Sequence, residues 1–136
     1  MAPRTKTELE DFLEHWEADK NGCKQAFVRL LTRLRELPEV ELDFVPRPGV
    51  TYSLRAARSG QTGRPLFALI DVIDENPRWL SVCFYEDLVT DPEERGDMVP
   101  AGILDEDGYC FDMESFDTGF VAYLETRIDE AGKHAS

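Results

Sequence analysis

The sequence has few of the residues from which catalytic and metal sites are usually built. It contains two histidines and three cysteines, and no two cysteines have the spacing of a zinc or redox motif. His15 and His134 have no serine or cysteine near them in the sequence that would suggest a nucleophilic triad. We therefore expect no catalytic residue, no bound metal and no cofactor.

Long apolar segments are also missing. No run is long enough to cross a membrane, and the N-terminus lacks the apolar core of a signal peptide. Cys23, Cys83 and Cys110 are widely spaced and odd in number, and we interpret them as small buried side chains with reduced thiols. These features predict a cytoplasmic protein that does not associate with membranes.

Positive charge is scarce as well. The formal net charge is −13, which argues against nucleic acid as a partner because a phosphate backbone requires a concentrated basic surface. The distribution is uneven: the range 44–70 holds four arginines and no acid, whereas the range 79–136 holds fifteen acids and three bases. A small anion could therefore bind near the first range.

The 136 residues are enough for one domain with its own core, preceded by a loose tail at residues 1–6. Thr7 and Glu10 form a capping box that opens a helix over residues 7–19. A second helix is predicted over residues 23–37, before Pro38. The short connection between the two helices predicts an antiparallel helical hairpin.

After this hairpin the apolar pattern changes from a period of 3.6 residues to a period of two. The segment Leu66–Tyr85 consists of two β-prone runs around a turn and predicts the central β-hairpin. Other strands are predicted at 40–45, 50–57, 101–104 and 109–112, the last two joined by a turn at Asp107-Gly108. A last helix starts at Ser115 or Asp117 and ends near residue 131, before Gly132. The predicted fold is α+β, with an antiparallel meander of four to six strands and a C-terminal helix packed on the sheet.

Strand register decides which residues share a face of this sheet. We expect opposed residue numbers to sum to about 122 for the pair 50–57 with 66–73, and to about 152 for the next pair. One face then forms a coherent core of Val50, Tyr52, Leu54, Leu66, Ala68, Ile70, Val72, Leu80, Val82 and Phe84. The other face mixes polar and apolar groups: Thr51, Ser53, Arg55, Phe67, Leu69, Asp71, Ile73, Trp79, Ser81, Cys83 and Tyr85.

This mixed face is the main candidate for function. We expect a non-enzymatic interaction module that binds a protein partner or a second copy of itself, with accessible interface residues Phe67, Leu69, Trp79 and Tyr85. A helix that covers the face, with Asp71 hydrogen-bonded to its neighbours, is the structural alternative.

A second hypothesis is an enzyme or sensor that binds a small anion. It requires Arg47, Arg55, Arg78 and Asp71 to converge in one concavity. The candidate ligand-binding residues are Arg47, Tyr52, Arg55, Asp71, Arg78, Trp79 and Ser81.

Several phrases resemble a family of small uncharacterised bacterial proteins. They are RPGVTYSLR at residues 47–55, PRWLSVCFY at 77–85, Thr90-Asp91-Pro92, and DGYCFD at 107–112. The resemblance covers most of residues 44–128 and implies no established activity. The order of elements is more distantly similar to that of YdhG-like proteins, which resemble frataxin in fold. Frataxin-like proteins bind iron on acidic helices, so this analogy implies a third hypothesis, an acidic metal-binding protein, with Glu10, Glu14 and Glu17 as loose counterparts.

Overall fold

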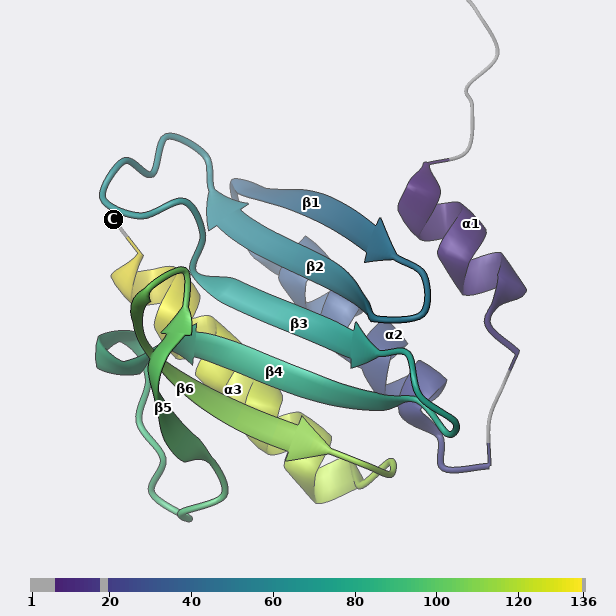
Figure 1. Ribbon diagram of the computed structural model, residues 1–136. Coiled ribbons are helices and arrows are strands. Elements are labelled where there is room, and N and C mark those ends of the chain that lie inside the picture. Colours follow the sequence, from purple (N-terminus) through teal and green to yellow (C-terminus); the bar gives the residue numbers. More distant parts are fainter. Residues whose placement is uncertain (1–6, 18–19, 136) are drawn as a thin grey trace, which may run out of the picture.

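The computed structural model describes residues 7–17 and 20–135, so the tail predicted at residues 1–6 lies outside the described residues. Over the described ranges the chain forms two N-terminal helices, a six-stranded antiparallel sheet and a C-terminal helix on that sheet (Figure 1). The predicted α+β fold class is confirmed. The elements are α1 (Glu8–His15), α2 (Cys23–Glu36), β1 (Val40–Arg47), β2 (Thr51–Arg58), β3 (Ala68–Ile73), β4 (Trp79–Tyr85), a 3₁₀ turn η1 (Glu86–Leu88), β5 (Asp97–Ile103), β6 (Glu106–Met113) and α3 (Thr118–His134).

The helix ends follow local chemistry. The Thr7 hydroxyl accepts a 3.1 Å hydrogen bond from the Glu10 backbone N–H, as the capping box predicts. The helix stops at His15, earlier than expected, and part of the predicted end, residues 18–19, lies outside the described residues. Of the two candidate caps for α3, Asp117 is the one used.

The position of Gly132 corrects one expectation. It does not end the last helix but lies inside α3, which continues to His134. A Cβ atom at this position would lie 3.3 Å from a Leu37 methyl group and 3.4 Å from the Phe67 ring. Glycine is therefore explained by close packing of neighbouring segments rather than by a C-terminal cap.

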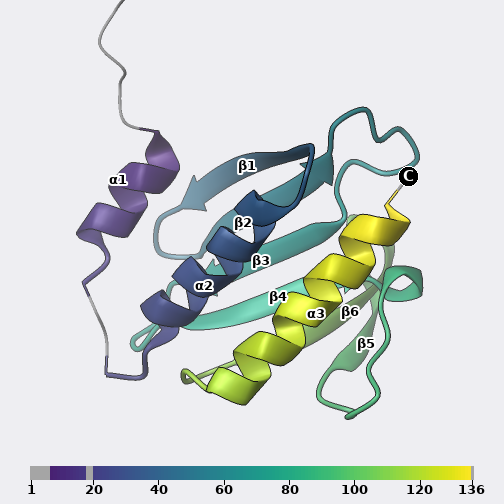
Figure 2. The same cartoon turned by 180° about the vertical axis from the view of Figure 1, so that it is seen from behind.

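Helices cover only one face of the sheet. Figure 2 shows α2 and α3 side by side across that face, with α1 beyond the β1–β2 end. The rings of Phe12 and Trp16 on α1 contact Phe27 of α2, and Phe12 also contacts Phe44 and Tyr52 on the helix side of the sheet. The core under α2 and α3 comprises Phe27, Leu30, Leu31, Leu34, Leu54, Ile70, Val72, Leu80, Val82, Phe84, Phe111, Val121, Leu124 and Ile128. No helix of the described residues is both long enough and apolar enough to cross a membrane.

The register agrees with the predicted division of the strands into two faces. β3 and β4 pair with residue numbers that sum to 152, as in Leu69 opposite Cys83. β2 and β3 pair with sums of 124, as in Ser53 opposite Asp71, which is two more than expected. Because a shift of two residues preserves the alternation of side chains, both predicted faces survive. The exception on the core side is Val50, which precedes β2 and is 60% exposed.

The order of the strands is β1-β2-β3-β4-β6-β5, so the last two do not continue the meander. The chain crosses to the far edge, forms β5 and returns as β6 beside β4. The β5–β6 turn is at Leu104 and Asp105, whose φ angles are +47° and +67°, and not at Asp107-Gly108. Gly108 instead lies within β6 opposite Tyr85, where a Cβ atom would lie 3.3 Å from an Ile103 methyl group.

Candidate functional site on the uncovered sheet face

We call the face opposite α2 and α3 the open face. It is the predicted mixed face, and Figure 1 shows no helix in front of it. Its side chains come from strands β1 to β6 by the alternation of the register. The residues of the open face used below are Asp43, Arg47, Thr51, Ser53, Arg55, Leu69, Asp71, Ile73, Trp79, Ser81, Cys83, Cys110 and Asp112.

Asp71 lies near the centre of the open face. Its neighbours across the strands are Ser53 on β2 and Ser81 on β4. The Ser53 hydroxyl donates a 2.5 Å hydrogen bond to Asp71 Oδ1. The prediction that Asp71 is hydrogen-bonded to a neighbour is therefore confirmed, whereas the helix that was to cover it is absent from the described residues.

The environment of this carboxylate is poorly solvated. Burial raises the pKa of Asp71, and the Ser53 hydrogen bond with the nearby charges of Arg55 and Arg47 only partly opposes it. Three of the four residues expected in an anion site therefore lie on the same face. Their arrangement gives this face an acid flanked by two bases, and Arg55 has a buried Nε with no hydrogen-bond partner among the described residues.

Apolar side chains surround Asp71. Leu69 and Ile73 are its neighbours on the same face of β3, and both are partly buried. Trp79 lies opposite Ile73, is also partly buried, and its indole N–H donates a 2.9 Å hydrogen bond to Glu75. The centre of the open face thus combines one desolvated acid with three partly accessible apolar side chains.

Two predicted interface residues are not accessible. Phe67 is fully buried because it precedes β3 and packs its ring against α3 at Gly132. Tyr85 is fully buried because the Arg64 guanidinium lies 4.1 Å above its ring, held there by Asp87 and Glu106. The expectation of accessibility is wrong for these two residues, and of the four only Leu69 and Trp79 are partly exposed.

Arg78 and Tyr52 lie on the other side of the sheet. The Arg78 guanidinium is within 5.1 to 5.3 Å of the ring centres of Phe12, Trp16 and Tyr52, and its Nε donates a 2.9 Å hydrogen bond to Asp74. Tyr52 pairs with Val72 and faces the helices. Arg78 therefore does not converge with Arg47, Arg55 and Asp71, and the four-residue concavity that the anion-binding hypothesis requires is not formed.

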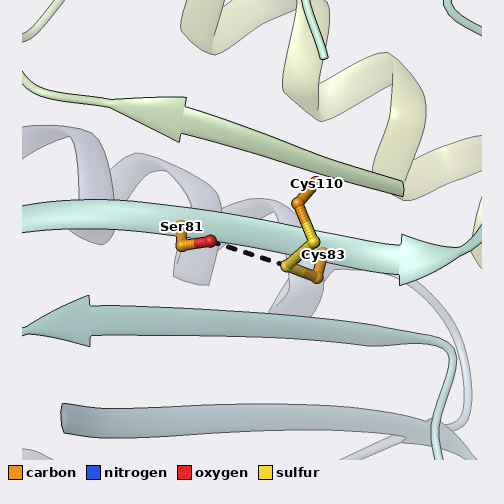
Figure 3. The surroundings of a disulfide bond; sticks show 3 residues. All are labelled: Ser81, Cys83 and Cys110. Carbon is orange, nitrogen blue, oxygen red and sulfur yellow. Dashed lines mark hydrogen bonds between the residues drawn. A yellow bond between two sulfur atoms is a disulfide. The ribbon is translucent and has the colours of Figure 1, made fainter. Parts of the chain in front are cut away.

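A disulfide bond joins Cys83 of β4 to Cys110 of β6 on the open face (Figure 3). The expectation of three reduced thiols is wrong for this pair, because the β4–β6 register places the two cysteines directly opposite each other. Cys83 Sγ also lies 3.5 Å from the Ser81 hydroxyl oxygen. The interpretation as a small buried side chain with a free thiol holds for Cys23, which is fully buried. Sequence spacing alone gave no sign of the bond.

The described residues contain no group of three or more His, Cys, Asp or Glu side chains placed to hold a metal ion. No protein-family model matches the chain, and neither a curated protein nor a solved structure shows significant similarity to it.

Proposed function

We propose that this protein is a non-enzymatic interaction module in which two copies associate through their open faces. The observation that carries the proposal is the uncovered centre of the sheet, where Leu69, Ile73 and Trp79 surround Asp71 without a helix over them. Apolar side chains grouped on a surface in this way usually mark a contact surface.

The charges on the open face also support association between identical copies. An interface across a two-fold axis uses the same patch twice, so that patch must complement itself. The open face carries Arg47 and Arg55 close enough to Asp71 to lower its pKa. A second copy can place an arginine against Asp71 of the first and receive the same contact in return. The carboxylate, disfavoured by burial, would gain a further opposite charge.

Sedimentation equilibrium over a range of salt concentrations tests the proposal. Each chain carries a formal net charge of −13, so repulsion between copies opposes association at low salt and is screened at high salt. We therefore expect a dimer that becomes tighter as salt increases. A protein that stays monomeric at all salt and protein concentrations would contradict the proposal.

A pair of matched variants locates the interface. Leu69→Glu places a charge at the centre of the open face and should give a folded monomer. Val28→Glu makes the same kind of change on α2, where Val28 is 39% exposed, and should leave the dimer intact. Circular dichroism and thermal unfolding establish that both variants fold. If the two variants dimerise equally well, the open face is not the interface.

The compartment remains a prediction. The expectation of a cytoplasmic protein rests partly on reduced thiols, and the Cys83–Cys110 bond removes that support.

A further inference from the structure

β1 forms one edge of the sheet and keeps an unbroken register with β2 over all eight of its residues. The Ser59 N–H donates to the Glu39 carbonyl, which fixes the phase of the hydrogen-bond ladder. Because antiparallel partners alternate between bonded and non-bonded pairs, odd-numbered residues of β1 bond to β2 and even-numbered residues point their backbone groups outward. Val40, Leu42 and Phe44 thus present outward N–H and C=O groups.

This phase also explains a difference from the predicted strand. Pro46 was expected to end β1, yet the strand continues to Arg47. Pro46 occupies an even, outward position, where a missing N–H costs no hydrogen bond to β2. The strand therefore remains regular up to the turn.

The opposite edge, β5, is shaped differently. It contains Pro100, a positive φ of +52° at Ala101 and a register shift between Val99 and Ile103. Irregularities of this kind protect an edge from pairing with another strand. Among the described strands, β1 is therefore the edge suited to accept one.

A groove of about 330 Å³ lies beside β1, between the start of α1 and the end of α2. Leu42 and Phe44 line it together with Leu9, Leu54 and Arg35. These two β1 residues are also among those whose backbone groups point outward. An added strand would place every second side chain on the side of the sheet that faces this groove.

The charges around β1 select the chemistry of the added strand. Glu41 and Asp43 are exposed on the open side of β1, and Glu8 and Glu10 line the groove. Two copies of β1 would place acids opposite acids: with Leu42 opposite itself, for example, Glu41 faces Asp43 of the other copy. Directly opposed like charges destabilise a strand pair, whereas a strand rich in Lys or Arg forms favourable pairs.

We propose that β1 accepts an extended segment of another protein as an additional strand, in which apolar residues alternate with Lys or Arg. The backbone of the segment bonds to Leu42 and neighbouring even positions, its apolar side chains lie over the groove, and its basic side chains lie beside Glu41 and Asp43. This surface is separate from the open-face dimer interface, and the two proposals stand or fall independently.

The test uses two short synthetic peptides, one alternating Val with Lys and the other alternating Val with Glu. Calorimetry should detect binding of the Val/Lys peptide alone. Amide hydrogen exchange followed by NMR should slow by about tenfold or more at Leu42 and Phe44 when the peptide is bound. Methylating the peptide backbone nitrogens on the edge that faces β1 should abolish binding, because the same edge of the peptide then lacks its donors.

Two protein variants separate strand addition from general attraction to an acidic protein. Glu41→Lys should weaken the Val/Lys peptide by about fivefold. Glu86→Lys makes the same charge change at an exposed position outside β1 and should have little effect. Equal weakening by both variants, no binding, or binding without protection at Leu42 and Phe44 would overturn the proposal. So would protection of these amides that rises with protein concentration in the absence of peptide, because a second copy would then occupy the edge.

Discussion

The Tyr123 hydroxyl donates a 2.5 Å hydrogen bond to Asp91 Oδ1 and so ties α3 to the acidic loop between β4 and β5. The Tyr109 hydroxyl donates to the other carboxylate oxygen at 2.6 Å. The backbone N–H groups of Arg95 and Gly96 complete the set, each at 2.9 Å. One carboxylate thus accepts from a helix, a strand and its own loop, which explains why this acidic segment has a defined conformation.

Replacing this carboxylate should destabilise the protein. Asp91→Asn keeps one acceptor oxygen but directs an NH₂ group toward a donor, so we expect the free energy of unfolding to fall by about 2 kcal/mol. Urea unfolding measures the change. The control is Glu94→Gln, an exposed acid of the same loop, which should leave stability almost unchanged. Equal midpoints for the two variants would show that the Asp91 contacts contribute no net stability.

The same carboxylate should control stability in acid. Burial alone would raise the pKa of Asp91, but hydrogen bonds from Tyr109, Tyr123 and two backbone amides overcome this and lower the pKa to about 2. The unfolded chain has the ordinary value of 3.8, so this stabilisation is fully present above that pH and is lost as the pH falls towards 2. The loss should be about 1–2 kcal/mol after allowance for solvent screening. Unfolding curves between pH 5 and pH 2, at roughly half-unit steps, should show a shallower decline for Asp91→Asn.

Arg78 should hold α1 in place. Its guanidinium lies over rings of α1 and β2 while it bonds to Asp74, and a lysine cannot reproduce the planar stacking. Arg78→Lys should therefore speed amide exchange in α1 by about tenfold, equivalent to about 1.4 kcal/mol. Arg95→Lys removes a similar stack over Phe120 and Tyr123 and should leave α1 exchange unchanged. Unaltered α1 exchange in the Arg78 variant would mean that the apolar contacts suffice.

The disulfide predicts a specific count of reactive thiols. Alkylation of the denatured, unreduced protein should modify only Cys23, and prior reduction should expose all three cysteines to the reagent. Reduction should also lower the free energy of unfolding by about 2–4 kcal/mol, because the bond closes a loop in the unfolded chain. Mass spectrometry and urea unfolding provide the two readouts. Three reactive thiols without reduction would contradict the Cys83–Cys110 bond.

Local patterns predicted those parts of the fold that depend on local chemistry. Thr7 and Asp117 cap helices as expected, and β4 begins at Trp79 and ends at Tyr85 as predicted. The two faces of β2 to β4 also followed from alternation, since an error of two residues in register leaves the faces unchanged.

Features that depend on distant partners could not be predicted in this way. Cys83 and Cys110 meet only because β6 inserts beside β4, and no periodicity encodes that choice. Phe67 looked like an open-face residue until α3 was placed against it, and Tyr85 is covered by Arg64 from a loop. Gly108 and Gly132 carried the signals of a turn and a cap, yet close packing explains both.

The insertion of β6 between β4 and β5 has a consequence for synthesis on the ribosome. Until residue 113 has left the exit tunnel, β4 has no partner on that side, and the segment 79–85 presents an unpaired apolar strand edge. Such an edge is prone to pair with other chains. We expect nascent chains that are stalled or truncated before β6 to aggregate, whereas chains released after residue 113 can close the sheet.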